Sequence, residues 1–194
     1  MTYPAALSRS LLPGHGPLLV LGARAPFRDA VAPLDVLARA HPGMVGAWAT
    51  AATEETLGSR AAVRRWERAW GFAEGRSESA GESYSRALIH ELDFAPPSSL
   101  QQRHVDATGR EVARTDFWWA SVGVAGEFDG LGEYDLPLHR GDEAARRATV
   151  RREKEREVAL QSVTRGVAHW TWADLRQPEW LARILTAYGI PRAR

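Results

Sequence analysis

Three acidic side chains fall in the stretch from Arg114 to Gly130, where the sequence predicts two adjacent strands. Glu127 and Asp129 are two residues apart, so strand alternation places them on one face. Asp116 reaches that face if the two strands pair. Carboxylates gathered on one small face repel each other unless a hard cation lies among them, and magnesium prefers a few carboxylates with water completing its octahedron. The pattern predicts a magnesium site, with surface acids at strand ends and a turn as the alternative.

The single lysine of the chain is a second candidate for chemistry. Of the 25 basic residues, only Lys154 is not an arginine. It lies between Val150 and Val158 at helical spacing, so we expect the three to share one stripe. On such a stripe, the lysine either extends its stem across the edge of the core or places its ammonium at the active edge of the sheet. Chance is the alternative explanation for its being the sole lysine.

The composition limits the class of protein and its partners. At 194 residues, with 44% apolar and 25% charged residues, the chain is expected to form one globular domain, or one domain with a helical annex. The absence of cysteine excludes disulfides, thiolate metal sites and a cysteine nucleophile, and fits a reducing cytoplasm. The net charge of +1 means that any nucleic-acid surface must be a local patch. The apolar run at 17–22 is too short for a membrane span or a signal segment, so we expect neither.

The first part of the chain is expected to be mainly helical, with a boundary after residue 78. Ser59 is the expected cap of the third helix, whose other side carries arginines at 60, 64, 65 and 68. A solvated basic face and a phosphate-contacting face are both open for these arginines. The expected elements are a short strand at 18–21 and helices at 29–40, 44–57 and 59–71.

The remainder, residues 79–194, is expected to form an α+β (or α/β) unit around a mixed sheet of about four strands. Ser79 and Glu82 match a capping box that begins its first helix. His104 and His169 are expected on strands, more in structural than in catalytic roles. Alternation favours core packing over base stacking for the strand tryptophans at 118, 119, 170 and 172. The expected elements are helices at 82–92, 143–163 and 179–188, and strands at 100–105, 112–120, 122–129 and 167–172.

This order of elements, with its acids, resembles the restriction-endonuclease-like fold of the P-D…(D/E)-X-K nucleases. The likeness is greatest to the very-short-patch-repair-like domain of unknown function in actinobacterial proteins of the AbiEi-type antitoxin family. It covers about the last three-fifths of the chain, and members often begin with a winged-helix domain that we do not find here. The stretches that carry it are G-R-S-E-S-A-G-E-S-Y-S-R at 75–86, R-T-D-F-W-W at 114–119, V-A-G-E-F-D-G at 124–130, R-E-K-E-R-E at 152–157 and H-W-T-W-A-D-L at 169–175.

The resemblance implies magnesium-dependent hydrolysis of phosphodiester bonds. Asp116 and Glu127 would hold the metal, and Glu82 matches an acid that the fold often adds, although a helix cap is the alternative. Asp129 stands where the lysine of the motif is expected, and a carboxylate does not stabilise a phosphate transition state. Lys154, on the following helix, would supply that positive charge. A second departure is Glu133, where relatives commonly have lysine.

Two functions follow as expectations. The first is a magnesium-dependent DNA endonuclease that uses Asp116, Glu127 and Lys154, in defence or repair. The second is a catalytically degenerate nuclease fold that acts as a DNA-binding or toxin–antitoxin regulatory protein, and the acids at 129 and 133 and the low net charge favour it. Nucleic acid, with DNA ahead of RNA, is the expected partner. A homodimer or a cognate toxin–antitoxin partner is compatible with both functions.

Overall fold

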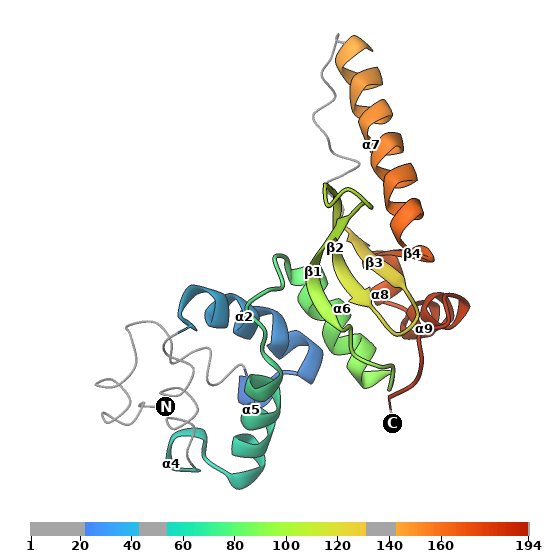
Figure 1. Cartoon of the computed structure of the whole chain (residues 1–194). Helices are drawn as coiled ribbons and strands as arrows, with labels where there is room; N and C mark the ends of the chain where they lie inside the picture. The colour runs from blue at the N-terminus through green and yellow to red at the C-terminus, as the bar shows by residue number, and fades with distance from the viewer. Residues whose placement is uncertain (1–21, 43–53, 131–142, 194) are drawn as a thin grey trace. The chain divides into compact units, whose positions relative to one another are not determined.

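The computed structural model describes residues 22–42, 54–130 and 143–193, with the backbone alone at 143–150, 152 and 153. The expected strand at 18–21, most of the helix at 44–57 and Glu133 lie outside these residues. The described helices and strands (Figure 1) are α2 (Phe27–Ala40), α4 (Glu54–Leu57), α5 (Arg60–Phe72), α6 (Ala80–Glu91), β1 (Ser99–Val105), β2 (Glu111–Trp119), β3 (Val124–Asp129), α7 (Glu143–Val163), β4 (Gly166–Thr171), α8 (Trp172–Leu175) and α9 (Pro178–Ala187).

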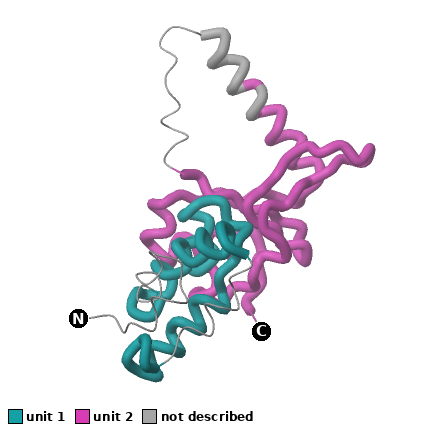
Figure 2. The backbone as a smooth tube through the Cα atoms, turned by 90° about the vertical axis from the view of Figure 1, so that its left-hand side faces the viewer, with its two compact units in different colours: residues 1–87 teal, residues 88–194 magenta. Residues whose placement is uncertain are grey.

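The chain divides into two compact units, residues 1–87 and 88–194 (Figure 2). In the first unit, apolar side chains of α2 and α5 form a common core. The indole rings of Trp66 and Trp70 stack with their centroids 5.5 Å apart, and Leu34 is fully buried in the same cluster. Ser59 caps α5 as expected, since its hydroxyl accepts a hydrogen bond from the Ala62 amide at 3.2 Å.

A buried ion pair connects helices α2 and α6 in the first unit. The Arg86 guanidinium of α6 donates to both carboxylate oxygens of Asp35 in α2, at 2.8 and 2.9 Å. Asp35 also accepts from the Glu74 amide at 2.6 Å, and the Arg86 guanidinium lies 4.3 Å from the centroid of the Phe72 ring. Burial of Asp35, which is 1% exposed, is tolerable because its charge is both paired and hydrogen-bonded.

The second unit contains a four-stranded mixed sheet in the order β1-β2-β3-β4, as Figure 1 shows. The pairs β1–β2 and β2–β3 are antiparallel, while β3 and β4 are parallel and are connected through α7. A parallel pair needs a long crossover, and α7 provides it. The expected α+β class and the expected four strands flanked by helices are confirmed.

The two faces of the sheet differ in chemistry. One face, which we call the packed face, buries Phe117, Trp119, Ala168 and Trp170 at 1% exposure or less. The core positions expected for Trp119 and Trp170 are therefore confirmed, whereas Trp118 is half-buried and Trp172 belongs to helix α8 and not to a strand. The opposite face carries the candidate acids, and we call it the acidic face. The helices α8 and α9 contact β4, whereas α7 contacts β1, β2 and β4.

None of the described helices combines the length and the apolar composition that a bilayer crossing requires.

Gly126 of β3 lies where a side chain has no room. A Cβ atom there would be 2.6 Å from Cη2 of Trp170 and 2.9 Å from Cζ3 of Trp119. Both indoles are 1% exposed, so neither ring can move freely. We predict that Gly126→Ala lowers the free energy of unfolding by about 1–3 kcal/mol, the usual cost of overpacking. Urea denaturation measures the change. The control is Gly130→Ala, whose nearest neighbour would be 3.9 Å away; an equal loss there would contradict the prediction.

His104 is a buried imidazole of β1 whose Nε2 lies 2.9 Å from the Thr115 hydroxyl. Burial lowers the pKa of His104 below its ordinary value of 6.5. At pH values well above 6.5 the imidazole is neutral in both the native and the unfolded chain. As the pH falls through the ordinary pKa, the unfolded chain binds the proton more readily than the native one. We predict that this residue makes stability decrease on acidification. The urea midpoint, measured at several pH values, should depend less on pH in His104→Gln than in the wild-type chain. In the control His90→Gln, which changes an exposed histidine, the dependence should stay as in the wild type.

Candidate functional site

Asp116 bridges the point where β2 and β3 stop pairing. The β2–β3 register runs only as far as Phe117 opposite Gly126, and the next position would place Asp116 opposite Glu127 on the acidic face. Instead of a continued ladder, the Asp116 carboxylate accepts from the Phe128 amide at 2.9 Å. The side chain thereby replaces a backbone hydrogen bond and holds the two strands together where they separate.

The second oxygen of Asp116 accepts from the side-chain amide of Gln101 at 3.2 Å. Gln101 belongs to β1 and has a φ of +52°, in the left-handed region that a residue other than glycine rarely adopts. Both carboxylate oxygens of Asp116 are therefore engaged by neighbouring strands. Backbone strain of this kind concentrates at functional sites, which makes the surroundings of Asp116 a candidate for function.

Glu127 forms an ion pair with Arg156 of α7. The guanidinium donates to Oε1 through a close contact from Nη2 and to Oε2 at 3.4 Å from Nη1. The same Nη2 lies 3.4 Å from the carbonyl oxygen of Arg114 in β2. The Glu127 side chain is only 12% exposed, so its charge needs the compensation that Arg156 supplies.

Asp129 faces His169 of β4, its near neighbour in the parallel register. The His169 Nδ1 lies 3.3 Å from Asp129 Oδ2 and 3.8 Å from Glu127 Oε2. Both contacts come from the same ring nitrogen, so His169 lies between the two carboxylates. His104 lies on β1, and two strands separate β1 from β4, so His104 and His169 do not share a site.

Lys154 points away from this cluster. Its side chain is exposed, and so is that of Val158 at 60%, so the expectation that these residues form an inward stripe is wrong. The stripe that faces the sheet instead contains Arg156 and, four residues later, the fully buried Leu160. A shift of two residues along a helix turns a side chain to the opposite side, which explains why the ammonium is replaced by a guanidinium at Glu127.

Glu82 caps the beginning of α6. Its carboxylate accepts from the Glu78 amide at 2.8 Å, and its own amide donates to the Ser79 hydroxyl at 3.2 Å. These contacts match the capping alternative for Glu82. The residue belongs to the first unit, whereas Asp116, Glu127 and Asp129 belong to the second.

A resident divalent ion does not fit the arrangement of these acids. Within the part of the chain that the structure describes, no three histidine, aspartate or glutamate side chains group as metal ligands. The carboxylates of Asp116 and Glu127 are the right kind of ligand for magnesium. However, the first is occupied by protein donors and the second by Arg156, which already supplies the positive charge. A magnesium site would require the guanidinium to leave, so we derive no catalytic step through a metal.

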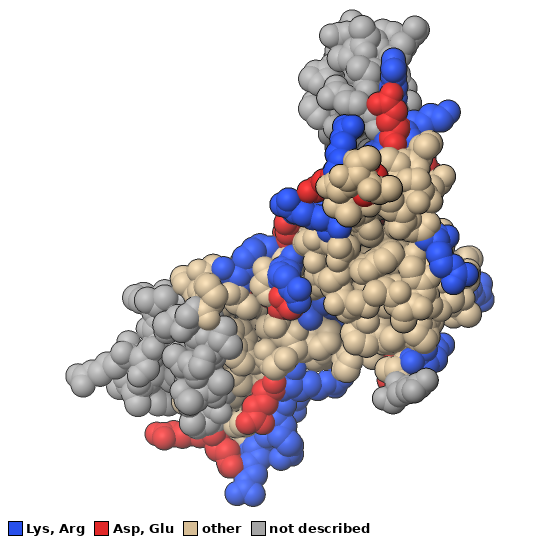
Figure 3. Space-filling model, in the orientation of Figure 1, with Lys and Arg blue, Asp and Glu red and all other residues tan. Residues whose placement is uncertain are grey.

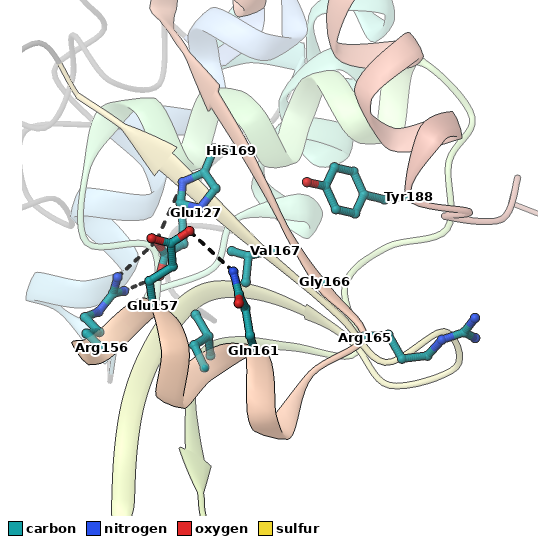
Figure 4. Close-up of a pocket in the computed structure, with 10 residues that line it drawn as sticks. Glu127, Arg156, Glu157, Gln161, Arg165, Gly166, Val167, His169 and Tyr188 are labelled. Atoms are coloured by element: carbon teal, nitrogen blue, oxygen red, sulfur yellow. Dashed lines mark hydrogen bonds and ion pairs between the residues drawn. The ribbon is translucent and has the colours of Figure 1, made fainter. Parts of the chain in front are cut away.

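A pocket of about 540 Å³ opens beside this cluster. It lies between the C-terminal part of α7, strand β4 and Tyr188, which follows α9. Figure 4 shows Glu127, Arg156 and His169 grouped at one end of it, with the Tyr188 ring on another side. The acidic face is therefore accessible at its β4 edge, and its charged groups can meet a ligand.

Comparison with known proteins adds relatives but no activity. Two curated sequences, the uncharacterized protein MT2308 of Mycobacterium tuberculosis strain CDC 1551/Oshkosh and the uncharacterized protein Rv2248 of strain H37Rv, are each 28% identical over 123 residues. The matched segment is 63% of this chain and 41% of each relative. The chain thus matches about two-fifths of their length. No family model and no solved structure matches the chain.

The pairing of Glu127 with Arg156 can be tested through stability. We predict that Arg156→Met lowers the free energy of unfolding by about 1–3 kcal/mol, because it leaves a largely buried carboxylate without its donor. Adding Glu127→Gln to that variant should recover part of the loss, since the uncompensated charge is then removed. Urea denaturation of the four members of the cycle measures both effects.

Lys154→Met on the same helix is the matched control and should change stability by no more than about 0.5 kcal/mol. A loss at position 154 as large as that at 156, or additive losses in the double variant, would contradict the pairing.

Proposed function

We propose that this chain is a DNA-binding protein built on a nuclease-like arrangement of helices and strands, in which an ion pair takes the place of a metal centre. The observation that carries the proposal is that Glu127 is neutralised by Arg156 while Lys154 faces solvent. A nuclease site of the expected kind needs the opposite: a carboxylate open to a cation and a free ammonium beside the phosphate.

The order of elements supports a relation to the nuclease-like fold. One helix, three antiparallel strands, a long helix and a parallel fourth strand follow each other as α6, β1 to β3, α7 and β4. This order agrees with the resemblance found in the sequence, which implies nucleic acid as the partner. A likeness of fold is an analogy for function, so the chemistry of the surface has to carry the rest.

Basic side chains surround the acidic face of the second unit. Arg103 and Arg114 occupy opposite positions of β1 and β2 on that face, and Arg151 and Lys154 project from α7, all four exposed. Figure 3 shows basic and acidic side chains mixed at the base of α7, next to a broad area that is mostly uncharged. Guanidinium groups pair well with phosphates, and two of these arginines, Arg103 and Arg151, pair with exposed carboxylates at 3.1 and 2.8 Å. Such surface pairs are weak and can be exchanged for phosphate contacts.

The first unit offers a second basic surface. Arg64, Arg65 and Arg68 of α5 are exposed. Arg65 donates to the Ala23 carbonyl at 2.7 Å, and the Arg68 guanidinium lies 4.2 Å from the centroid of the Phe27 ring. Their stems are held in place while their charge remains at the surface, which favours the phosphate-contacting alternative for this helix.

A magnesium-dependent endonuclease is the second candidate. It is favoured by one observation: the continued register would place Asp116 and Glu127 opposite each other on the acidic face. Displacement of Arg156 would then leave two carboxylates, which is the number of protein ligands that magnesium commonly has when a phosphate completes its shell. A toxin–antitoxin role, a cognate partner and a homodimer stay predictions.

Binding and cleavage assays on the same DNA separate the two candidates. We predict that the full chain binds duplex DNA in the presence of a chelator, with an affinity that falls steeply with salt. We also predict that it leaves plasmid intact in magnesium. The variant Arg114→Gln should weaken binding several-fold and reduce the slope of log K against log salt, whereas Arg183→Gln, an exposed arginine of α9, should do neither.

Magnesium-dependent cleavage that disappears in Asp116→Asn would establish the endonuclease instead. Failure to bind DNA at any salt concentration would overturn the proposed function.

A further inference from the structure

The pocket at the β4 edge of the acidic face has the chemistry of a nucleobase site. Its volume of about 540 Å³ lies within the range of small-ligand pockets. Its walls combine apolar atoms with a few polar groups that converge from α7 and from the end of α9, as Figure 4 shows. All of its residues belong to the second unit.

The strand side of the pocket is lined by apolar atoms. It is formed by the Gly166 backbone and Val167 of β4, with the buried Leu160 beside them. A Cβ atom at Gly166 would be 3.0 Å from Cε1 of Tyr188, so the aromatic ring lies directly against the strand. Tyr188 is nevertheless 39% exposed, which leaves part of its ring free to contact a ligand. Aromatic surface of this kind stacks on bases regardless of sequence.

Polar groups at the rim match the edges of a base. The Gln161 amide lies 3.4 Å from a carboxylate oxygen of Glu157, a weak contact between two exposed side chains of α7. Figure 4 shows both side chains close together on one side of β4 and the Tyr188 ring on the other, with its hydroxyl directed toward the strand. An amide, a carboxylate and a hydroxyl together present donors and acceptors, as the Watson–Crick edge of a base requires.

The charges of the pocket favour one nucleotide of a strand over a free nucleotide. Arg156 is already neutralised by Glu127, and the two arginines that line the pocket, Arg156 and Arg165, are matched in number by two glutamates, Glu127 and Glu157. A free di- or triphosphate would meet no net positive charge here. A nucleotide that belongs to a strand carries a single phosphate, so it needs less positive charge from the pocket than a free di- or triphosphate does.

We propose that this pocket accepts one unpaired base of a bound nucleic-acid strand, with its flat face against Tyr188 and Val167 and its edge toward Gln161 and Glu157. The inference rests on the proposed function and adds a preference to it. A base in an intact duplex is stacked and paired, so only a bulged, frayed or single-stranded nucleotide can enter.

Three fluorescent probes test the proposal with the full chain: a paired DNA duplex, the same duplex with one bulged nucleotide, and that bulge without its base. We expect the bulged duplex to bind at least about fivefold more tightly than the paired one, since a stacked base contributes about 1–3 kcal/mol. The abasic bulge should lose this advantage. In Tyr188→Ala and in Gln161→Ala, the affinities for the bulged and the paired duplex should be nearly equal.

Trp180→Ala is the matched control, because it removes an aromatic side chain that is 45% exposed but outside the pocket. Equal affinity of the wild-type chain for the paired and bulged probes would overturn the inference and leave DNA binding in place. Loss of the preference in Trp180→Ala as well as in Tyr188→Ala would also overturn it. No binding to any probe would remove the proposed function and this inference together.

Discussion

The second unit depends on how it neutralises one carboxylate. Glu127 is placed on β3 between two neighbouring strands, where only 12% of its side chain meets solvent. A charge so situated destabilises the fold unless a partner of opposite sign lies within hydrogen-bonding reach. Arg156 provides that partner and, through Nη2, also contacts the backbone of β2. The position of α7 on the sheet and the electrostatics of the acidic face are thus set by the same contact.

This contact also relates the cluster to the pocket beside it. Arg156 and Leu160 lie on the sheet-facing stripe of α7, and the intervening turn brings Glu157 and Gln161 to the pocket rim. One rotation of the helix therefore decides both which cation meets Glu127 and which polar groups are offered to a ligand. The proposed functions differ in whether a cation from solution can replace the guanidinium.

Local patterns were sufficient to predict most of the second unit. The helix expected at 143–163 has those bounds, and the four strands lie within two residues of their expected positions. The shared face of Glu127 and Asp129 follows from period-two alternation. The failures concern partners: Lys154 was expected at the site because two valines four residues away were taken to mark the buried stripe. The pairs Glu127–Arg156 and Asp35–Arg86 join residues 29 and 51 positions apart, and no local pattern encodes which of many arginines will be the partner.

The left-handed backbone of Gln101 sets stability and function against each other. Relief of its strain, on the order of 1 kcal/mol, needs only a glycine. Glycine has no side-chain amide, so Asp116 would then lose the hydrogen bond that Gln101 donates. A design procedure that optimises folding alone would choose glycine here and remove the Gln101 contact of that carboxylate. Substitutions chosen to make this domain more stable should therefore leave position 101 unchanged.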